Sequence, residues 1–171
     1  MATDKESDIG AIAAVAPVGD PPQSKYERLI ARAKQVPAAR TIVVHPCEET
    51  ALRGPLDAAA AGIIVPVLVG PAAKIRAVAR ERRLDIERFE IVDVPHSEAA
   101  AAKAVELIHQ SKGELLMKGS LHTDELMREV ASSKTGLRTA RRISHVFIMD
   151  VPTYAETLFI TDAAINIFPD L

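Results

Sequence analysis

Apolar and polar positions alternate in blocks along most of the chain. Short apolar runs rich in β-branched residues begin near residues 41, 65, 89 and 114, at nearly equal separations. Between these runs, apolar residues recur at helical spacing, as Leu52 does with Leu56. A strand, a turn, a helix and a second turn fill each interval. The pattern therefore predicts an α/β fold of consecutive βαβ units, with a parallel sheet covered by helices.

Cap and stop residues mark the ends of the expected helices. Ser24, followed three residues later by Glu27, predicts a capping box, Gly62 predicts a helix stop, and Ser97 predicts an N-cap. Together with the periodicity, these residues predict helices over 24–36, 49–61 and 72–82, a helix from residue 97, and a helix over 123–131.

The two ends of the chain differ from its centre. Residues 1–23 are broken by proline and glycine, so we expect a flexible N-terminal arm before an α/β domain over 24–142. Residues 143–171 hold two apolar runs with no long helix between them, which predicts an antiparallel pair or the opening strands of a second, truncated domain. In that region Asp162 and Asn166 either bind a ligand in a cleft or order a turn.

Composition narrows the function. The chain has 21 Lys and Arg residues and 23 Asp and Glu residues, a balance that argues against a general nucleic-acid or anionic-membrane binder. The single cysteine fits a reducing compartment, and no Cys/His group has zinc spacing. No apolar run is long enough to cross a membrane. We expect a cytoplasmic protein with no metal, nucleic-acid or membrane partner.

The segment from Lys118 to Arg128 is the densest in chemically useful side chains. It follows a predicted strand and opens a predicted helix, where open α/β sheets bind ligands and free backbone N–H groups favour phosphate. Gly119 would let the backbone approach an anion, Ser120 and Thr123 would donate hydroxyls, and Lys118 and Arg128 would add positive charge. The alternative is an ordinary capped helix with a solvated lysine and arginine.

The turn after the first strand is a second candidate for a ligand-binding or catalytic site. Arg53 either faces a ligand there or pairs with Glu49, four residues earlier on the same helix. Cys47 with His45 has the residue types of a thiol nucleophile and a base. Nothing in the sequence fixes the base or an oxyanion hole, so a bystander thiol is the favoured interpretation.

Six further segments occur in a characteristic order and spacing: Val65–Gly70, Leu116–Gly119, Thr123–Arg128, Gly136–Arg138, Ile143–Val146 and Phe159–Leu171. They resemble the phosphate acetyltransferase and phosphate butyryltransferase family, with the butyryltransferase branch expected as the nearer one. The resemblance covers nearly all of the chain from Tyr26 onward.

The resemblance implies a two-domain α/β fold like that of the isocitrate and isopropylmalate dehydrogenases, with the active site in the interdomain cleft. Such enzymes convert acyl-CoA and inorganic phosphate to acyl phosphate and free CoA. Coenzyme A is a substrate, and no cofactor is expected. Phosphate would sit between Lys118 and Thr123, and the family's phosphate-contacting arginine matches Arg128. The complete enzyme is expected to be a homodimer.

The family's chain continues well beyond Leu171, and its later half supplies the residues assigned to catalysis and much of the CoA site. We therefore expect this chain to hold the first domain and the start of the second, and to be inactive alone. The alternative is a non-catalytic module that binds acyl-CoA or an acyl phosphate, or that regulates another protein.

Overall fold

Four short strands form a parallel sheet at the centre of the structure, a computed structural model that describes residues 24–165. The strands are β1 (Ala39–Val44), β2 (Ile64–Gly70), β3 (Glu90–Asp93) and β4 (Leu115–Lys118). They lie in the order β3-β2-β1-β4, and every pairing is parallel. The predicted parallel sheet is therefore confirmed. The expected arm over residues 1–23 lies outside the described part of the chain.

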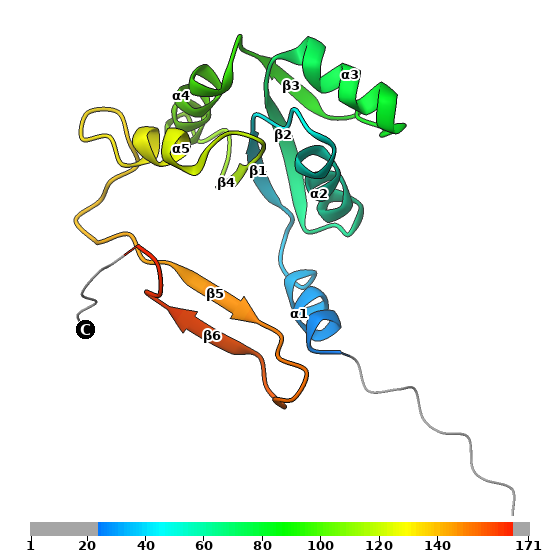
Figure 1. Cartoon of the computed structure of the whole chain (residues 1–171), viewed down its shortest axis with the longest axis vertical. Helices are drawn as coiled ribbons and strands as arrows, with labels where there is room; N and C mark the ends of the chain where they lie inside the picture. Colours follow the sequence, from blue (N-terminus) through cyan, green and yellow to red (C-terminus); the bar gives the residue numbers. More distant parts are fainter. Residues whose placement is uncertain (1–23, 166–171) are drawn as a thin grey trace, which may run out of the picture.

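Helices cover both faces of this sheet (Figure 1). Successive side chains of a strand point to opposite faces, and in β1 both faces are apolar. Ile42 and Val44 pack with α4 (Ser97–His109) and α5 (Thr123–Val130), whereas Val43 packs with α2 (Glu49–Ala60) and α3 (Ala72–Arg82). The same arrangement buries β2, so β1 and β2 form the core of the fold.

Most of the predicted helix ends are found in the structure. The capping box of Ser24 and Glu27 opens α1 (Lys25–Ala33), and Gly62 has a φ of 76° just after α2 ends. The predicted cap at Ser97 is wrong. His96 is the N-cap of α4, and its ring accepts a hydrogen bond from the amide of Ala99. Ser97 is the first helical residue instead, and its hydroxyl donates to Glu125 at 2.7 Å.

A separate hairpin follows the sheet. It consists of β5 (Val146–Met149) and β6 (Leu158–Thr161), which pair antiparallel. An antiparallel pair was one of the two arrangements that the sequence predicted for this region. Phe147 and Phe159 are 47% and 62% exposed. Lys25 of α1 reaches this hairpin, and its ammonium group lies 2.8 Å from the carboxylate of Asp150. Figure 1 shows α1 beside the hairpin, below the parallel sheet.

The strand order fixes where a ligand would bind. The chain runs outward from β1 through β2 to β3, then crosses back to place β4 on the other side of β1. The loops after β1 and β4 therefore diverge at the carboxyl edge, which makes this point the topological switch of the sheet. Among the described residues, no helix is long and apolar enough to cross a membrane.

Candidate functional site

The turn after β4 packs directly on the end of β1. The amide of Gly119 donates to the carbonyl of Val44 at 2.8 Å, and the amide of Ser120 donates to that of His45 at 3.0 Å. A Cβ atom on Gly119 would lie 2.4 Å from the Val44 carbonyl oxygen and 2.6 Å from the His45 carbonyl oxygen. Gly119 is thus required for the packing of two backbones. Its approach to an anion stays a prediction.

Ser120 ties the two loops of the switch point together. Its hydroxyl donates to the carbonyl of His45 at 2.7 Å and accepts the amide hydrogen of Cys47 at 3.1 Å. The same oxygen lies 3.3 Å from Nδ1 of the His45 ring. Sequence reasoning placed Ser120 as a ligand donor, but the structure uses its hydroxyl hydrogen inside the protein.

His45 occupies the middle of this edge. Its φ of 55° is in the left-handed region, which is uncommon for a residue other than glycine. Burial lowers the pKa of its imidazole below the usual value, and the positive charge of Lys74 lowers it further. Glu125 and Glu48 act in the opposite direction. The neutral ring is therefore favoured at neutral pH.

Cys47 lies beside His45 and is half-buried. Burial raises the pKa of its thiol, so the protonated form dominates near neutrality and the group is a poor nucleophile. This agrees with the interpretation of Cys47 as a bystander thiol.

Lys118 and Thr123 flank the turn. The ammonium group of Lys118 donates to the carbonyls of Gly119 and Leu121, at 3.2 and 2.9 Å, and so holds the turn closed. Thr123 is the first residue of α5 and is exposed. The structure thus brings Lys118, Gly119, Ser120 and Thr123 together at one end of the sheet.

Arg128 lies on α5 with its side chain directed back toward the start of the helix. Its guanidinium is 3.5 Å from Glu98, at the start of α4, and 3.8 Å from Asp124, in the first turn of α5. The side chain is 61% exposed, and exposed ion pairs of this length contribute little stability. Arg128 is therefore near the N-termini of two helices and is held there only weakly.

The remaining predicted site residues lie elsewhere. Arg53 pairs with Glu49 at 2.8 Å, which is the intrahelical alternative that the spacing offered. Asp162 follows β6 with a φ of 55°, and its amide donates to the carbonyl of His145. Asp162 thus belongs to the hairpin and not to the parallel sheet, whereas Asn166 lies outside the described residues.

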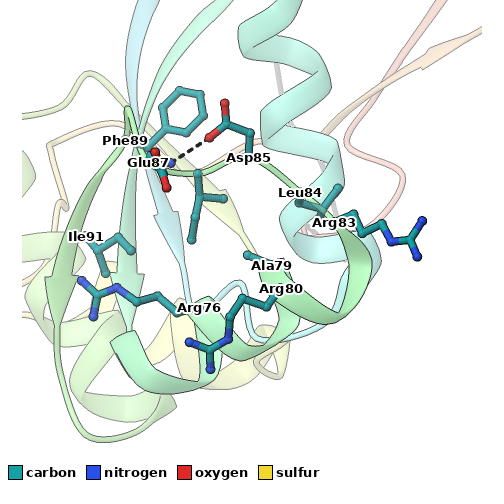
Figure 2. Close-up of a pocket in the computed structure, with 10 residues that line it drawn as sticks. Arg76, Ala79, Arg80, Arg83, Leu84, Asp85, Glu87, Phe89 and Ile91 are labelled. Atoms are coloured by element: carbon teal, nitrogen blue, oxygen red, sulfur yellow. Dashed lines mark hydrogen bonds between the residues drawn. The ribbon is translucent and has the colours of Figure 1, made fainter.

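A hollow of about 740 Å³ lies away from this edge, on the outer flank of the sheet (Figure 2). It is formed by the second half of α3, the loop that follows and the edge strand β3. Arg76 and Arg80 line it, while Figure 2 shows the Arg83 side chain directed away from both. Within residues 24–165 no group of three or more His, Cys, Asp or Glu residues could hold a metal ion.

Comparison with known proteins decides the family. The sequence profile of the phosphate acetyl/butaryl transferase family matches residues 96–171. The chain is 71% identical over 148 residues to the phosphate acetyltransferase of Rhizobium meliloti, which covers 86% of this chain and 47% of that protein. The chain belongs to the phosphate acetyl/butaryl transferase family.

Within this family, the expected greater similarity to the butyryltransferase branch is not found, because the phosphate acetyltransferase of Rhizobium meliloti is 71% identical. The phosphate butyryltransferase of Clostridium beijerinckii is 33% identical over 145 residues, covering 85% of this chain and 48% of that protein. The chain spans about half the length of the curated relatives it matches.

Solved structures of phosphotransacylases share the α/β fold. The EutD phosphotransacetylase of Staphylococcus aureus superposes with a TM-score of 0.59 at 16% identity, covering 84% of this chain and 52% of that one. A branched-chain phosphotransacylase of Enterococcus faecalis superposes with a TM-score of 0.58 at 24% identity, covering 77% and 45%.

Sequence reasoning missed the central position of His45 at the carboxyl edge of the sheet. It weighed His45 only as a base for Cys47, because the two residues are close in sequence. The neighbours of His45 come from the turn after β4, where Ser120 contacts the ring, and from α3, where the charge of Lys74 acts on it. A histidine directly after an apolar strand was the available signal, but the order of the strands was needed to interpret it.

Proposed function

We propose that this chain is the phosphate-binding half of an acyltransferase that converts acetyl-CoA or butyryl-CoA and phosphate to an acyl phosphate and free CoA. The observation that carries the proposal is the 71% identity to a protein named phosphate acetyltransferase, which extends over 86% of the chain. The carboxyl edge between β1 and β4 supports it independently, because this is where open α/β sheets bind ligands.

Phosphate would bind at the turn between Lys118 and Thr123. The first turn of α5 presents backbone N–H groups and the positive end of the helix dipole to this turn. A phosphate oxygen then attacks the thioester carbonyl, the carbon–sulfur bond breaks, and CoA leaves as the thiolate. The bound position of phosphate lowers the barrier by holding the nucleophile close to the carbonyl.

Arg128 would exchange its present partners for phosphate. Its contacts with Glu98 and Asp124 are long and exposed, so they are readily broken. A guanidinium binds a phosphate through two parallel hydrogen bonds and also stabilises the charge that develops on the thioester oxygen. Arg53 pairs with Glu49, so this ion pair would have to break before Arg53 could bind phosphate.

The complete enzyme is proposed to have the two-domain fold of the isocitrate and isopropylmalate dehydrogenases and to act as a homodimer. The β5–β6 hairpin would begin its second domain, with Asp162 and Asn166 facing the cleft. A two-stranded hairpin with apolar faces is not stable alone in water, which supports this assignment. The catalytic groups would come from the part of the relatives that this chain does not match, so the chain alone is expected to be inactive.

The test is thiol release from acetyl-CoA. We expect no release by the chain alone, and phosphate-dependent release by a fusion of this chain to the second half of the Rhizobium meliloti protein. In the fusion, Arg128→Ala should lower kcat/KM for phosphate by about 10- to 100-fold, the effect of losing a charged hydrogen bond. Arg76→Ala, on the outer flank of α3, is the matched control and should have no effect.

Three outcomes would each contradict a part of the proposal. Thiol release by the fusion without phosphate would indicate a hydrolase and not a transferase. Equal kinetics for the Arg128 and Arg76 variants would remove Arg128 from the site. Turnover by the 171-residue chain itself would show that the second half is not needed.

A further inference from the structure

His45 lies where the carboxyl ends of three strands meet. It follows β1, its amide donates to the carbonyl of Val69 in β2 at 2.7 Å, and its carbonyl accepts from the turn after β4. A Cβ atom on Gly70 would lie 3.7 Å from Cδ2 of the His45 ring, so the imidazole also rests against the end of β2. The left-handed φ of 55° turns the residue out of the strand direction.

The hydrogen bonds of Ser120 favour one of the two neutral tautomers of the His45 ring. The hydroxyl of Ser120 has one hydrogen, and the carbonyl of His45, at 2.7 Å, can only accept it. The amide of Cys47 can only donate, so Ser120 Oγ acts as an acceptor toward its other partners. Nδ1 of His45 lies 3.3 Å from that oxygen, and this arrangement favours the tautomer that carries its hydrogen on Nδ1. Nε2 is left with a free lone pair.

Charged groups near the starts of three helices act electrostatically on the ring. Lys74 comes from the first half of α3, Glu48 caps α2, and Glu125 lies in the first turn of α5. Burial and Lys74 outweigh the two carboxylates and lower the pKa of the ring. Near neutral pH His45 therefore offers a neutral hydrogen-bond acceptor, beside the backbone N–H groups at the start of α5 and the carboxylates of Glu48 and Glu125.

We propose that Nε2 of His45 accepts the hydrogen of a protonated phosphate oxygen and so selects phosphate over a fully deprotonated anion such as sulfate. The inference rests on the proposed function, because it assumes that phosphate binds at this edge. Hydrogen phosphate and sulfate have the same charge and nearly the same shape, but only the first has a hydrogen to donate. Acceptance of that hydrogen orients the three remaining oxygens toward the N–H groups and cations. His45 is thus a positioning and specificity residue.

The test is nuclear magnetic resonance of the purified 171-residue chain at about pH 7.5, titrated with inorganic phosphate and separately with sulfate. Before any ligand is added, the imidazole nitrogens of His45 should show the tautomer protonated on Nδ1. Phosphate should then shift the Nε2 signal together with the amides of residues 119–123. Sulfate should bind about fivefold more weakly, the effect of one missing hydrogen bond, and should leave Nε2 unshifted.

Two variants complete the test. His45→Asn keeps a residue that tolerates a left-handed φ but ends short of the Nε2 position, so the preference for phosphate over sulfate should fall to about one. Ser120→Ala removes the partner of Nδ1 without touching the ring, and should move the proton toward Nε2 and weaken the preference. His109→Asn is the matched control, because His109 bonds the Thr135 carbonyl away from this edge.

The outcomes separate the inference from the proposed function. If phosphate shifts the amides of residues 119–123 but not Nε2, or if His45→Asn keeps the preference for phosphate, the role of His45 is refuted while the phosphate site stands. If phosphate shifts none of these amides, the placement of phosphate fails, and the role of His45 fails with it.

Discussion

Replacing Gly119 by alanine would place one methyl group inside the contact between β1 and the turn after β4. The new carbon would lie 2.4 Å from the Val44 carbonyl oxygen and 2.6 Å from the His45 carbonyl oxygen. Both atoms are backbone, and Val44 is fully buried in the central strand of the sheet. Neither can move aside as a flexible side chain would, so the turn itself has to shift outward.

The cost can be worked from the contacts that this shift would break. Inserting a methyl group into a well-packed core costs about 1–3 kcal/mol. The hydrogen bonds from the amides of Gly119 and Ser120 to β1 and its loop, at 2.8 and 3.0 Å, would weaken at about 1 kcal/mol each. We therefore expect Gly119→Ala to lower the free energy of unfolding by about 3–5 kcal/mol, a large part of the roughly 5–15 kcal/mol typical of a domain.

Urea unfolding of the 171-residue chain, followed by circular dichroism, measures this change. Gly54→Ala is the matched control, because a Cβ at Gly54 meets no atom within 4 Å and the residue lies inside α2. The control should stabilise the protein by up to about 1 kcal/mol, since alanine favours a helix. If Gly119→Ala unfolds within about 1 kcal/mol of the parent protein, the close approach of the two backbones is wrong.

Three further predictions concern other parts of the chain. Lys25→Met removes the ammonium group that bonds Asp150 and two carbonyls of the hairpin loop, so hydrogen exchange of β5–β6 should rise about tenfold while that of β1 is unchanged; equal exchange would refute the tether. The pKa of His45 is lower in the folded than in the unfolded state, so the unfolded chain binds more protons below about pH 6.5. The free energy of unfolding should therefore fall as the pH drops from 7 to 5, and His45→Asn should flatten this slope; a slope that is unchanged in the variant would contradict the assignment. The exposed Phe147 and Phe159 should bind the dye 1-anilinonaphthalene-8-sulfonate, and changing both to serine should remove most of its fluorescence; undiminished fluorescence would place the dye elsewhere.

The sequence was enough to predict the strands, the helices and the parallel sheet, because these depend on local periodicity. Helix α3 spans Ala72–Arg82, as predicted, since its apolar spacing and its flanking residues agree. The pairing of β4 with β1 could not be predicted, because strand order depends on contacts between residues far apart in the chain. Without that order, the two loops that form the switch point could not be matched.

In the candidate site too, the sequence predicts what depends on neighbouring residues and not the contacts between distant ones. Lys118, Gly119, Ser120 and Thr123 were predicted to lie together because they are consecutive on one turn. Their partners were not predictable, and Ser120 bonds a loop more than seventy residues away. The predicted cap at Ser97 failed for a related reason. Serine is a preferred N-cap residue, but here the hydroxyl of Ser97 donates to Glu125 of a neighbouring helix, and the ring of His96 serves as the cap.

The most direct test of the central claim is to identify the product. Phosphorus nuclear magnetic resonance of the fusion with acetyl-CoA and phosphate should show acetyl phosphate forming in step with free CoA, and Arg128→Ala should slow both equally. Free CoA without acetyl phosphate, or acetyl phosphate formed at the same rate by the Arg128→Ala variant, would contradict the claim that this edge of the sheet binds phosphate for acyl transfer.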